Sequence, residues 1–438
     1  THTSTLIAAR LAVESQSFDQ VSSELMRQSE MLEALRTSYS QLLYKLQSLR
    51  GNIQVCVRTR GPIARELTAG GKPCIEVIDD KELLCFDRKC REWRSFNFDQ
   101  VWDSHTHQSD VFADVEPLAL SVVDGNNASI IAYGQTGSGK TYTMSGYGLE
   151  YGISYRTMHK IFELLHSRQE ECLSSYRKAR IARKAAQAMN SNANPSENKN
   201  DASEFLNDDM DLKDEDIFNY SVEMSMLEIY NEQIFDLLDE NSSQHHKALD
   251  ARVSAEGEVI IVGLTNTQVL SIEDVFSTLD IGNANRATGN TSLNEHSSRS
   301  HCIVSVKVNV TKASITEAKS QLSGKLVLVD LAGSERVSKS GVTGQSLREA
   351  QNINKSLSAL GDVMEALAAN NNNTKSNNIG SGNGSGVTRN RHIPYRNSQL
   401  TYLLQDSLGG SSQTMMIVTL CPTDLTQDET LYTLNFAT

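Results

Sequence analysis

The first fifty residues carry apolar side chains at alternating steps of three and four. The positions on this seam are Ile7, Leu11, Phe18, Val21, Leu25, Leu32, Leu35, Tyr39, Leu42, Leu46 and Leu49, with Glu14 and Gln28 as exceptions. Such spacing, sustained for about six heptads, favours a coiled coil over residues 1–50. At about 1.5 Å of rise per residue it would be a stalk of roughly 65 Å that pairs with a second copy or a different chain. A single helix packed on the rest of the chain is the alternative, because Glu14 and Gln28 weaken the seam.

From residue 51 onward the pattern changes to short apolar runs separated by helical stretches. The runs that predict strands are residues 53–59, 128–133, 220–229, 302–310, 324–330 and 414–420. Helices are expected at residues 344–369 and 399–408. This alternation predicts a three-layer α/β domain with a central mixed sheet over residues 51–438.

Two segments interrupt this alternation and are expected to be flexible insertions. The first, about residues 167–216, follows a helix expected to end near His166 and is basic, then rich in Asn and Ser, then acidic from Asp208 to Asp216. We expect mostly disorder there beyond an initial helical extension. The second, about residues 370–388, is rich in Asn, Gly and Ser, a composition typical of a flexible loop.

A phosphate-binding motif follows the apolar run 128–133. Residues 134–141 read Gly-Gln-Thr-Gly-Ser-Gly-Lys-Thr; we call them the phosphate loop, and its expected phosphate contacts are Gln135, Thr136, Gly137, Ser138, Gly139, Lys140 and Thr141. Glycines let backbone N–H groups close around phosphates, and the following helix presents its positive end to them. Lys140 would reach the β- and γ-phosphates and Thr141 would hold Mg²⁺. A Gly-rich turn with a chance lysine is the alternative, and the loop alone does not separate ATP from GTP.

Two further polar segments suit the sensing of a γ-phosphate. The first sensor segment, residues 294–301, reads Asn-Glu-His-Ser-Ser-Arg-Ser-His, and the second, residues 330–335, reads Asp-Leu-Ala-Gly-Ser-Glu. Asp330 ends an apolar strand, where nucleotide-hydrolysing enzymes place the carboxylate that holds Mg²⁺, usually through water. Gly333 is positioned to offer a bare N–H group to the γ-phosphate.

These three segments together resemble the kinesin motor domain, in kinesin order and with kinesin-like spacing. Three more motifs match, at residues 228–232, 352–357 and 392–401, and the resemblance covers about residues 51–438. It implies a three-layer P-loop nucleotide-hydrolase fold, ATP and Mg²⁺ as ligands, ATP hydrolysis and movement along microtubules.

The resemblance also implies roles for the residues of both sensor segments. Ser298 would contact the metal or the γ-phosphate, and Ser297 and Asn294 would help to enclose the attacking water. Arg299 would pair with Glu335 when both segments close, which leaves Glu335 in the proton path from that water. The alternative for Arg299 and Glu335 is an ordinary exposed ion pair worth under about 1 kcal/mol.

Adenine recognition departs from the kinesin pattern. Kinesins usually carry Arg-x-Arg-Pro at the end of the first strand, and this chain has Arg58-Thr-Arg60-Gly61-Pro62, with a glycine before the proline. The resemblance implies that Arg58, Arg60 and Pro62 border the base; Arg58 keeps the family's register, whereas the inserted glycine would shift Pro62 out of it. Tyr142 is placed to stack on the base, with plain helix packing as the alternative.

The net charge and its distribution along the chain bear on which partner it binds. The chain has a net charge of −13, which opposes long-range attraction to an acidic polymer. Residues 336–400 nevertheless hold eight Lys or Arg against three acids, and in kinesins this stretch docks on tubulin. The expected microtubule contacts are Arg336, Lys339, Arg348, Lys355, Arg389, Arg391 and Arg396. A solvated basic surface without a partner is the alternative.

The order of the segments bears on the subfamily. A coiled coil that leads directly into the first strand, with the chain ending at Thr438, resembles the neck and motor of the minus-end-directed, C-terminal-motor kinesins. A non-motile tether and an end-depolymerising kinesin are the alternatives. Depolymerisers typically carry a strongly basic neck, whereas residues 1–50 hold five basic and five acidic side chains.

Composition places the chain in a reducing compartment. Its seven cysteines show no C-x-x-C spacing, which favours neither a zinc site nor a disulfide framework. No apolar run approaches the ~20 residues that span a bilayer, and no signal peptide is recognisable. We expect the cytoplasm and the microtubule cytoskeleton, with the spindle as one candidate location, and neither a membrane nor a nucleic acid as partner.

Overall fold

The computed structural model describes most of the chain beyond residue 52. The described residues are 53–191, 217–239, 248–255, 258–288, 297–312, 320–336, 345–377, 391–409 and 412–438, together with positions 27, 31, 35 and 38. The chain divides into two compact units, the smaller made of residues 1–46, 163–220 and 309–322 and the larger of residues 47–162, 221–308 and 323–438. The larger unit holds the motifs discussed above.

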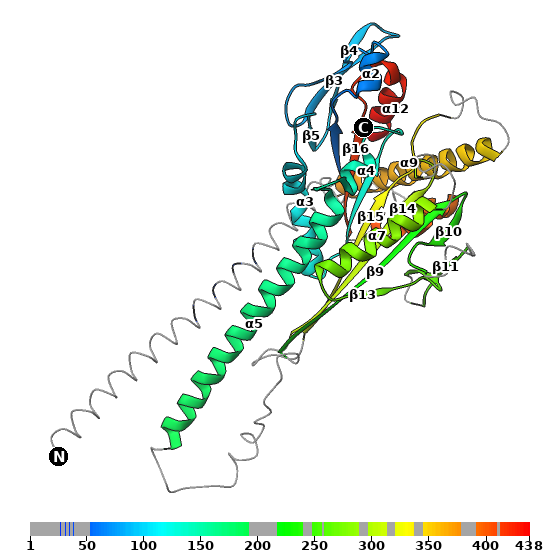
Figure 1. The fold of residues 1–438 in the computed structure, drawn as a ribbon. Coiled ribbons are helices and arrows are strands. Elements are labelled where there is room, and N and C mark those ends of the chain that lie inside the picture. The colour runs from blue at the N-terminus through cyan, green and yellow to red at the C-terminus, as the bar shows by residue number, and fades with distance from the viewer. Residues whose placement is uncertain are drawn as a thin grey trace. The chain divides into compact units, whose positions relative to one another are not determined.

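A large mixed sheet organises the described part of the chain (Figure 1). Its strands are β10 (Gln233–Asp236), β9 (Phe218–Tyr230), β14 (His301–Lys312), β15 (Ser320–Asp330), β6 (Ala128–Tyr133), β16 (Gln413–Leu420), β1 (Ile53–Thr59) and β5 (Gln100–Trp102), in that spatial order, with β13 (Thr267–Val269) paired to β9. From β15 to β5 neighbouring strands are parallel, and β10 and β13 run antiparallel to β9. The predicted central mixed sheet is confirmed.

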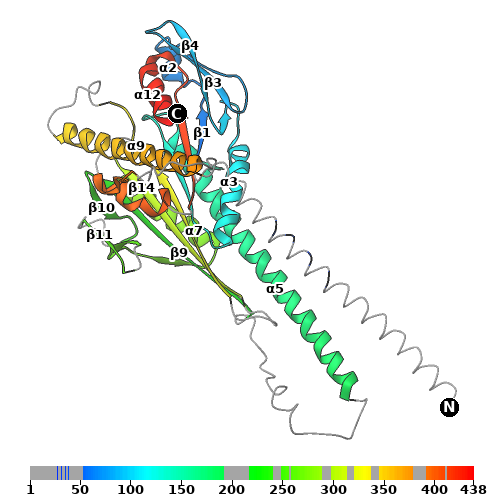
Figure 2. The same ribbon diagram turned by 180° about the vertical axis from the view of Figure 1, so that it is seen from behind.

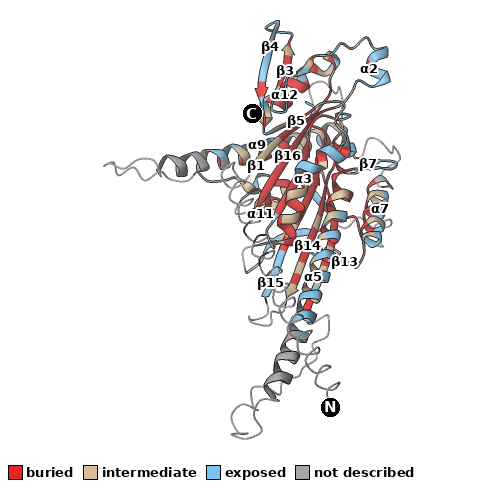
Figure 3. Ribbon diagram, turned by 90° about the vertical axis from the view of Figure 1, so that its left-hand side faces the viewer, coloured by how far each residue is buried: buried red, intermediate tan, exposed pale blue. Residues whose placement is uncertain are grey.

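The central strands are apolar on both faces. All six residues of β6 and all eight of β16 are buried, as Figure 3 shows for β16. Within β6, Ile131 and Tyr133 belong to one hydrophobic cluster, while Ile130 and Ala132 are buried outside it. Because side chains alternate along a strand, these two pairs face opposite sides, as expected for a parallel sheet covered twice.

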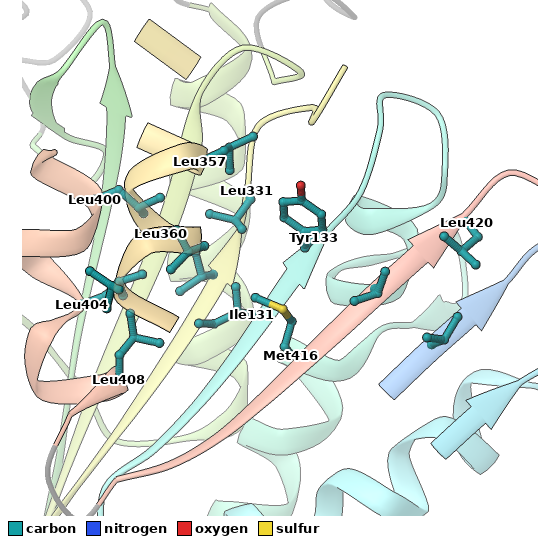
Figure 4. Close-up of a cluster of buried hydrophobic side chains, with 14 of the residues drawn as sticks. Ile131, Tyr133, Leu331, Leu357, Leu360, Leu400, Leu404, Leu408, Met416 and Leu420 are labelled. Carbon is teal, nitrogen blue, oxygen red and sulfur yellow. The ribbon is translucent and has the colours of Figure 1, made fainter. Parts of the chain in front are cut away.

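Helices cover both faces of the sheet. One layer consists of α9 (Gln345–Asn377), α10 (Gln399–Leu403), α11 (Gln405–Leu408) and α12 (Gln427–Ala437). Figure 4 shows Leu360 of α9, Leu404 between α10 and α11, and Leu408 of α11 around Ile131 and Met416 of the sheet. The other layer holds α3 (Gln108–Val123), the first turns of α5 (Ile153–Ser191) and α7 (Ile272–Thr288), which Figures 1 and 2 show on the side away from α9. The three-layer prediction is confirmed.

Smaller elements complete the larger unit. They are the antiparallel sheet β2 (Ile75–Val77), β3 (Glu82–Asp87) and β4 (Glu92–Asn97), the hairpins β7 (Gly146–Tyr147)–β8 (Glu150–Tyr151) and β11 (Asp250–Val253)–β12 (Val259–Val262), the short helices α2 (Ala64–Thr68) and α4 (Lys140–Met144), and the 3-10 turns η1 (Tyr395–Asn397) and η2 (Asp424–Thr426). The hairpin β7–β8 separates α4 from α5, so the helix after the phosphate loop is only five residues long.

The predicted strands and helices are largely confirmed, with different ends. All six predicted strands are present, and β9, β14 and β15 extend beyond their predicted bounds. The helix expected at 399–408 is instead two short helices, because the chain turns at Leu404.

Both predicted insertions begin with helix. Helix α5 continues to Ser191, which confirms the initial helical extension expected beyond His166. Residues 163–191 contain neither Gly nor Pro and are rich in helix-forming side chains. Helix α9 likewise continues to Asn377 through the Asn-rich run, which the flexible-loop prediction missed. Residues 192–216 and 378–390 lie outside the described part.

The coiled-coil prediction for residues 1–50 rests almost entirely on residues outside the described part. Positions 27, 31, 35 and 38 are described, and all four are helical. Pairing through this segment therefore stays a prediction. Among the described helices, none combines the length and apolarity needed to cross a membrane.

Replacing Leu360 by Ala tests the core beneath α9. Leu360 is fully buried in the cluster of Figure 4, so the substitution should cost about 2–5 kcal/mol of unfolding free energy through lost burial and a residual cavity. The measurement is the midpoint of urea unfolding. The matched control is Leu149→Ala, in the turn between β7 and β8 at 93% exposure, which should change stability by less than about 0.5 kcal/mol. Equal losses in both variants would contradict this account of the core.

Candidate nucleotide site

The phosphate loop leaves β6 after Tyr133 and enters α4 at Lys140. Gly134 adopts φ +149°, and a Cβ there would collide with the backbone oxygen of Thr419 in β16. The hydroxyls of Ser138 and Thr419 lie 2.6 Å apart and hold the loop to the same strand. Glycine is thus required where the loop crosses β16. Since α4 has a single turn, the N–H groups of the loop matter more for an anion than any helix dipole.

Lys140 lies on the floor of the loop. Its ammonium donates to the backbone oxygens of Gly134, at 2.8 Å, and Gln135, at 3.0 Å, and its side chain is buried. Burial lowers the pKa of Lys140, and the nearby carboxylates of Asp330 and Glu335 act against that shift. A buried cation held among backbone oxygens is placed to meet phosphate charge at the loop.

Asp330 at the end of β15 is the charged centre of the site. Its Oδ2 accepts hydrogen bonds from the hydroxyl of Thr141, at 2.9 Å, and from the guanidinium of Arg286, at 3.0 Å. Its Oδ1 is buried and has no hydrogen-bond partner among the described residues. A buried carboxylate oxygen without a partner is costly, and a hydrated cation beside Thr141 would satisfy it. The predicted metal residues Thr141 and Asp330 are therefore together and fit Mg²⁺.

Arg286 was missed by the sequence analysis. It stands in the last turn of α7, is 6% exposed, and donates to the backbone oxygens of Ser297, at 3.1 Å, and Ser300, at 3.0 Å, as well as to Asp330. One guanidinium therefore connects a helix, the first sensor segment and the second. No local pattern distinguishes it in the sequence from a surface arginine at a helix end.

The two sensor segments touch each other and the phosphate loop. The N–H group of Gly333 donates to the backbone oxygen of Ser298 at 2.8 Å. Both carboxylate oxygens of Glu335 accept from Thr136, one from its N–H group at 2.9 Å and one from its hydroxyl at 2.5 Å. A Cβ at Gly333 would collide with the side-chain oxygens of Thr136 and Glu335, so a larger residue there would displace the contact between these two side chains.

Arg299 and Glu335 have different partners in this conformation. The guanidinium of Arg299 lies 3.0 Å from Glu349 of α9, whose other carboxylate oxygen accepts from the hydroxyl of Tyr230 at 2.6 Å. Glu335 is bound to Thr136. The Arg299–Glu335 pair was predicted for closed sensor segments and stays a prediction for that state. Glu349 and Tyr230 were not identified from the sequence.

A pocket of about 440 Å³ opens beside the phosphate loop, lined by residues that include Arg58, Arg60, Ser138, Gly139 and Tyr142. Arg58 is buried, donates to Gln108 and Thr143, and lies 5.4 Å from the ring centre of Tyr142. Arg60 donates to the backbone oxygen of Gly137 at 2.8 Å and pairs with Glu66. Three of the four predicted adenine contacts therefore border one cavity next to the loop.

Pro62, the fourth, is exposed and lies outside this lining. Gly61, inserted before it, lines the pocket, as do His105 and His107 of the loop 104–107. Nothing in the sequence singled out these two histidines.

The predicted microtubule contacts fall into two groups. Arg348, Lys355, Arg391 and Arg396 are exposed, and the first two lie on an outward stripe of α9 that continues to Asp362 and Glu365. Lys355 lies 3.5 Å from Glu232, and Arg391 lies 2.9 Å from Glu365. Arg336 is also exposed, but it packs over the ring of Tyr432 in α12 at 4.4 Å, which ties the residue after the second sensor segment to α12. Asn294, Lys339 and Arg389 lie outside the described residues.

Comparison with known proteins agrees with this geometry. A family profile described as the kinesin motor domain matches residues 58–438. Kinesin-like protein KIN-14Q of Arabidopsis thaliana is 38% identical over 431 residues, which cover 95% of this chain and 30% of that protein. Kinesin-like protein KIN-14E of Oryza sativa subsp. japonica is 38% identical over 395 residues, 90% of this chain and 30% of that protein. The chain thus spans under a third of the length of either relative.

Two solved structures share the fold. One, described as the C-terminal motor and motor homology domain of Kar3Vik1 fused to a synthetic heterodimeric coiled coil, has a TM-score of 0.75 at 32% identity and covers 99% of this chain and 96% of that one. The other, described as a fast kinesin, has a TM-score of 0.65 at 32% identity and covers 88% and 90%.

Arg286→Met tests the buried pair at the centre of the site. The substitution leaves Asp330 buried without its cation, and we expect a loss of about 3–5 kcal/mol in unfolding free energy. The matched control is Arg391→Met, because the pair Arg391–Glu365 is 2.9 Å long but exposed, and its loss should cost less than about 1 kcal/mol. The measurement is urea unfolding of both variants. Similar losses of unfolding free energy would show that burial does not strengthen the Arg286–Asp330 pair.

Proposed function

The chain belongs to the kinesin motor family, and from that premise we propose that it is a microtubule-stimulated ATP hydrolase that converts hydrolysis into movement or force along microtubules. One observation carries the proposal. The phosphate loop, Asp330 and both sensor segments form a single connected site, and its Arg299 is bonded to α9, the helix whose outer face carries the candidate track contacts.

ATP and Mg²⁺ are the proposed ligands. Backbone N–H groups of residues 135–141 and the ammonium of Lys140 would bind the phosphates. Thr141 and Ser298 would hold Mg²⁺ directly and Asp330 through water, which suits the unpartnered Oδ1 of Asp330. When bound, Mg²⁺ neutralises phosphate charge as the terminal phosphate leaves. Arg58, Arg60 and Tyr142 would border the base, so the pocket that they line would hold the adenine.

The hydrolytic step would depend on closure of the sensor segments. Ser297 and Asn294 would position the attacking water, and Gly333 would turn its N–H group from Ser298 toward the γ-phosphate. Glu335 would leave Thr136, pair with Arg299 and take up the proton of the water. For this to happen Arg299 must release Glu349, so closure would loosen one tie between the first sensor segment and α9. A change at the nucleotide would in this way reach the track-facing helix.

The proposed track is the microtubule, met by Arg348, Lys355, Arg391 and Arg396 together with Lys339 and Arg389. The exposure of the first four supports this role, and the pairing of Arg336 with Tyr432 makes Arg336 a weaker candidate. The likeness to KIN-14 relatives and to a C-terminal motor supports minus-end direction, a dimer through residues 1–50, and a place on cytoplasmic microtubules, with the spindle as one candidate.

A non-motile tether or an end-depolymerising kinesin is the second candidate. The balanced charge of residues 1–50 is the observation against a depolymeriser. The connected hydrolytic site is the observation against a tether, since a tether needs no proton acceptor near the phosphate. Steady-state ATP hydrolysis with and without microtubules separates an enzyme from a tether, because only an enzyme that uses the track should be strongly stimulated by it.

Glu335→Ala tests the hydrolytic role. The variant should still bind ATP and microtubules but lose microtubule-stimulated hydrolysis by at least about 100-fold, because the group that takes up the proton is gone. ATP turnover and microtubule co-sedimentation are measured on the same preparation. The control is Glu76→Ala, an exposed glutamate of β2 that should leave both unchanged. Near-normal turnover by Glu335→Ala would refute the role.

Direction is tested by gliding. With the chain attached to a surface through its N-terminal segment, polarity-marked microtubules should move as expected for a minus-end-directed motor, and Glu335→Ala should not move them. Movement in the plus-end sense would refute the assignment. Binding without movement by the unmodified chain would favour the tether.

A further inference from the structure

The last residue of the first sensor segment, His301, is a buried imidazole with partners on two other elements. It begins β14 and is 3% exposed. Its Nδ1 accepts from the N–H group of Ala332 at 3.0 Å, and its Nε2 lies 2.8 Å from the hydroxyl of Ser356 in α9. One side chain therefore joins the first sensor segment, the second sensor segment and α9.

The hydrogen bonds fix where the proton of this imidazole lies. The N–H group of Ala332 can only donate, so Nδ1 must accept. The hydroxyl of Ser356 donates to the backbone oxygen of Ile353 at 2.8 Å, so it accepts from Nε2–H. Burial, together with the charges of Arg286 and Lys140, lowers the pKa of His301 to about 3, which keeps the ring neutral at physiological pH. The result is a one-way chain of donors from Ala332 to Ile353.

The two ends of this chain lie at functionally distinct places. Ala332 stands between Asp330 and Gly333, the carboxylate and the N–H group proposed to read the nucleotide. Ser356 is buried on the inner side of α9, next to Lys355 on its outer side. Leu331, which precedes Ala332, and Leu357, which follows Ser356, belong to the same hydrophobic cluster in Figure 4.

We infer that His301 is a positioning residue that transmits movement of the second sensor segment to α9 through its hydrogen bond to Ser356. The inference rests on the proposed function. It differs from the Arg299–Glu349 contact, which must break when the sensor segments close, because Ala332 precedes Gly333 and can keep its bond to His301 while Gly333 turns. His301 thus supplies the connection that persists in both states.

The geometry explains why an imidazole stands here. A side chain that only accepts would satisfy Ala332 and leave Ser356 without a donor, and one that only donates would do the reverse. An apolar side chain would leave two buried polar groups unpaired. The connection therefore consists of two hydrogen bonds, from Ala332 to His301 and from His301 to Ser356, and variants can remove them one at a time.

The test uses Ser356, which contacts neither the phosphate loop nor the candidate track surface. Ser356→Ala removes the hydroxyl that receives the proton of His301, and Ser356→Thr keeps a hydroxyl as the matched control. For each, the dissociation constant for microtubules is measured with ADP and with a non-hydrolysable ATP mimic, and the ratio of the two constants is the readout. Basal hydrolysis without microtubules and the melting temperature are measured alongside.

We expect Ser356→Ala to shrink this ratio about fivefold, the effect of one lost hydrogen bond in the coupling, with basal hydrolysis unchanged. Ser356→Thr should keep the ratio. The variant His301→Asn keeps an acceptor for Ala332, but its shorter side chain lacks the Nε2–H group that reaches Ser356. Adding Ser356→Ala to it should reduce the ratio no further than His301→Asn alone.

An unchanged ratio of dissociation constants in Ser356→Ala overturns the inference. It does so even if the melting temperature falls, because the hydroxyl would then contribute to stability and not to coupling. Equal losses in the Ala and Thr variants overturn it too, because the hydroxyl would then not matter. If the unmodified chain binds microtubules equally in both nucleotides, the proposed function fails and the inference fails with it. That result is distinguishable, because it appears before any variant is made.

Discussion

The nucleotide site depends on one buried carboxylate. Asp330 lies where β15 ends, 8% exposed, and a single oxygen of its side chain is shared by Thr141 of the phosphate loop and Arg286 of α7. A charge cannot remain in such surroundings unless its partners are held in place. The sheet, the loop and the helix are therefore fixed relative to one another at the point where a metal ion would bind.

Around Asp330, three polar contacts join groups that would take other partners in the proposed reaction. Gly333 is bonded to Ser298, Glu335 to Thr136 and Arg299 to Glu349, and each of these groups has a second task in the proposed reaction. None of the three contacts involves Asp330 itself. The contrast suits a protein that must hold its ligand firmly while it changes shape around it, because a stable anchor and weakly held neighbours give two states of similar free energy.

Whether a feature could be predicted from the sequence depended on how far apart along the chain its residues lie. The phosphate loop and the strands around it are continuous in sequence, so their residues could be named from local pattern. The contacts Arg286–Asp330, Arg299–Glu349 and Tyr230–Glu349 join residues 44, 50 and 119 positions apart, and only the folded sheet brings them together. The error at the end of α9 has another cause. The Asn-rich composition after residue 369 suggested a loop, but no Gly or Pro stands in residues 370–377 to end the helix.

The outward stripe of α9 has a further consequence. Along it two cations, Arg348 and Lys355, come first, and two anions, Asp362 and Glu365, follow roughly 18 Å further along the axis. On a uniformly acidic support the cations of the leading end would be drawn in, whereas at the trailing end Glu365 is paired with Arg391 and the repulsion would fall mainly on Asp362. Attraction would therefore be stronger at the leading end, so that the order of charges along α9, and not only their total, would bias how the molecule is oriented on the proposed track.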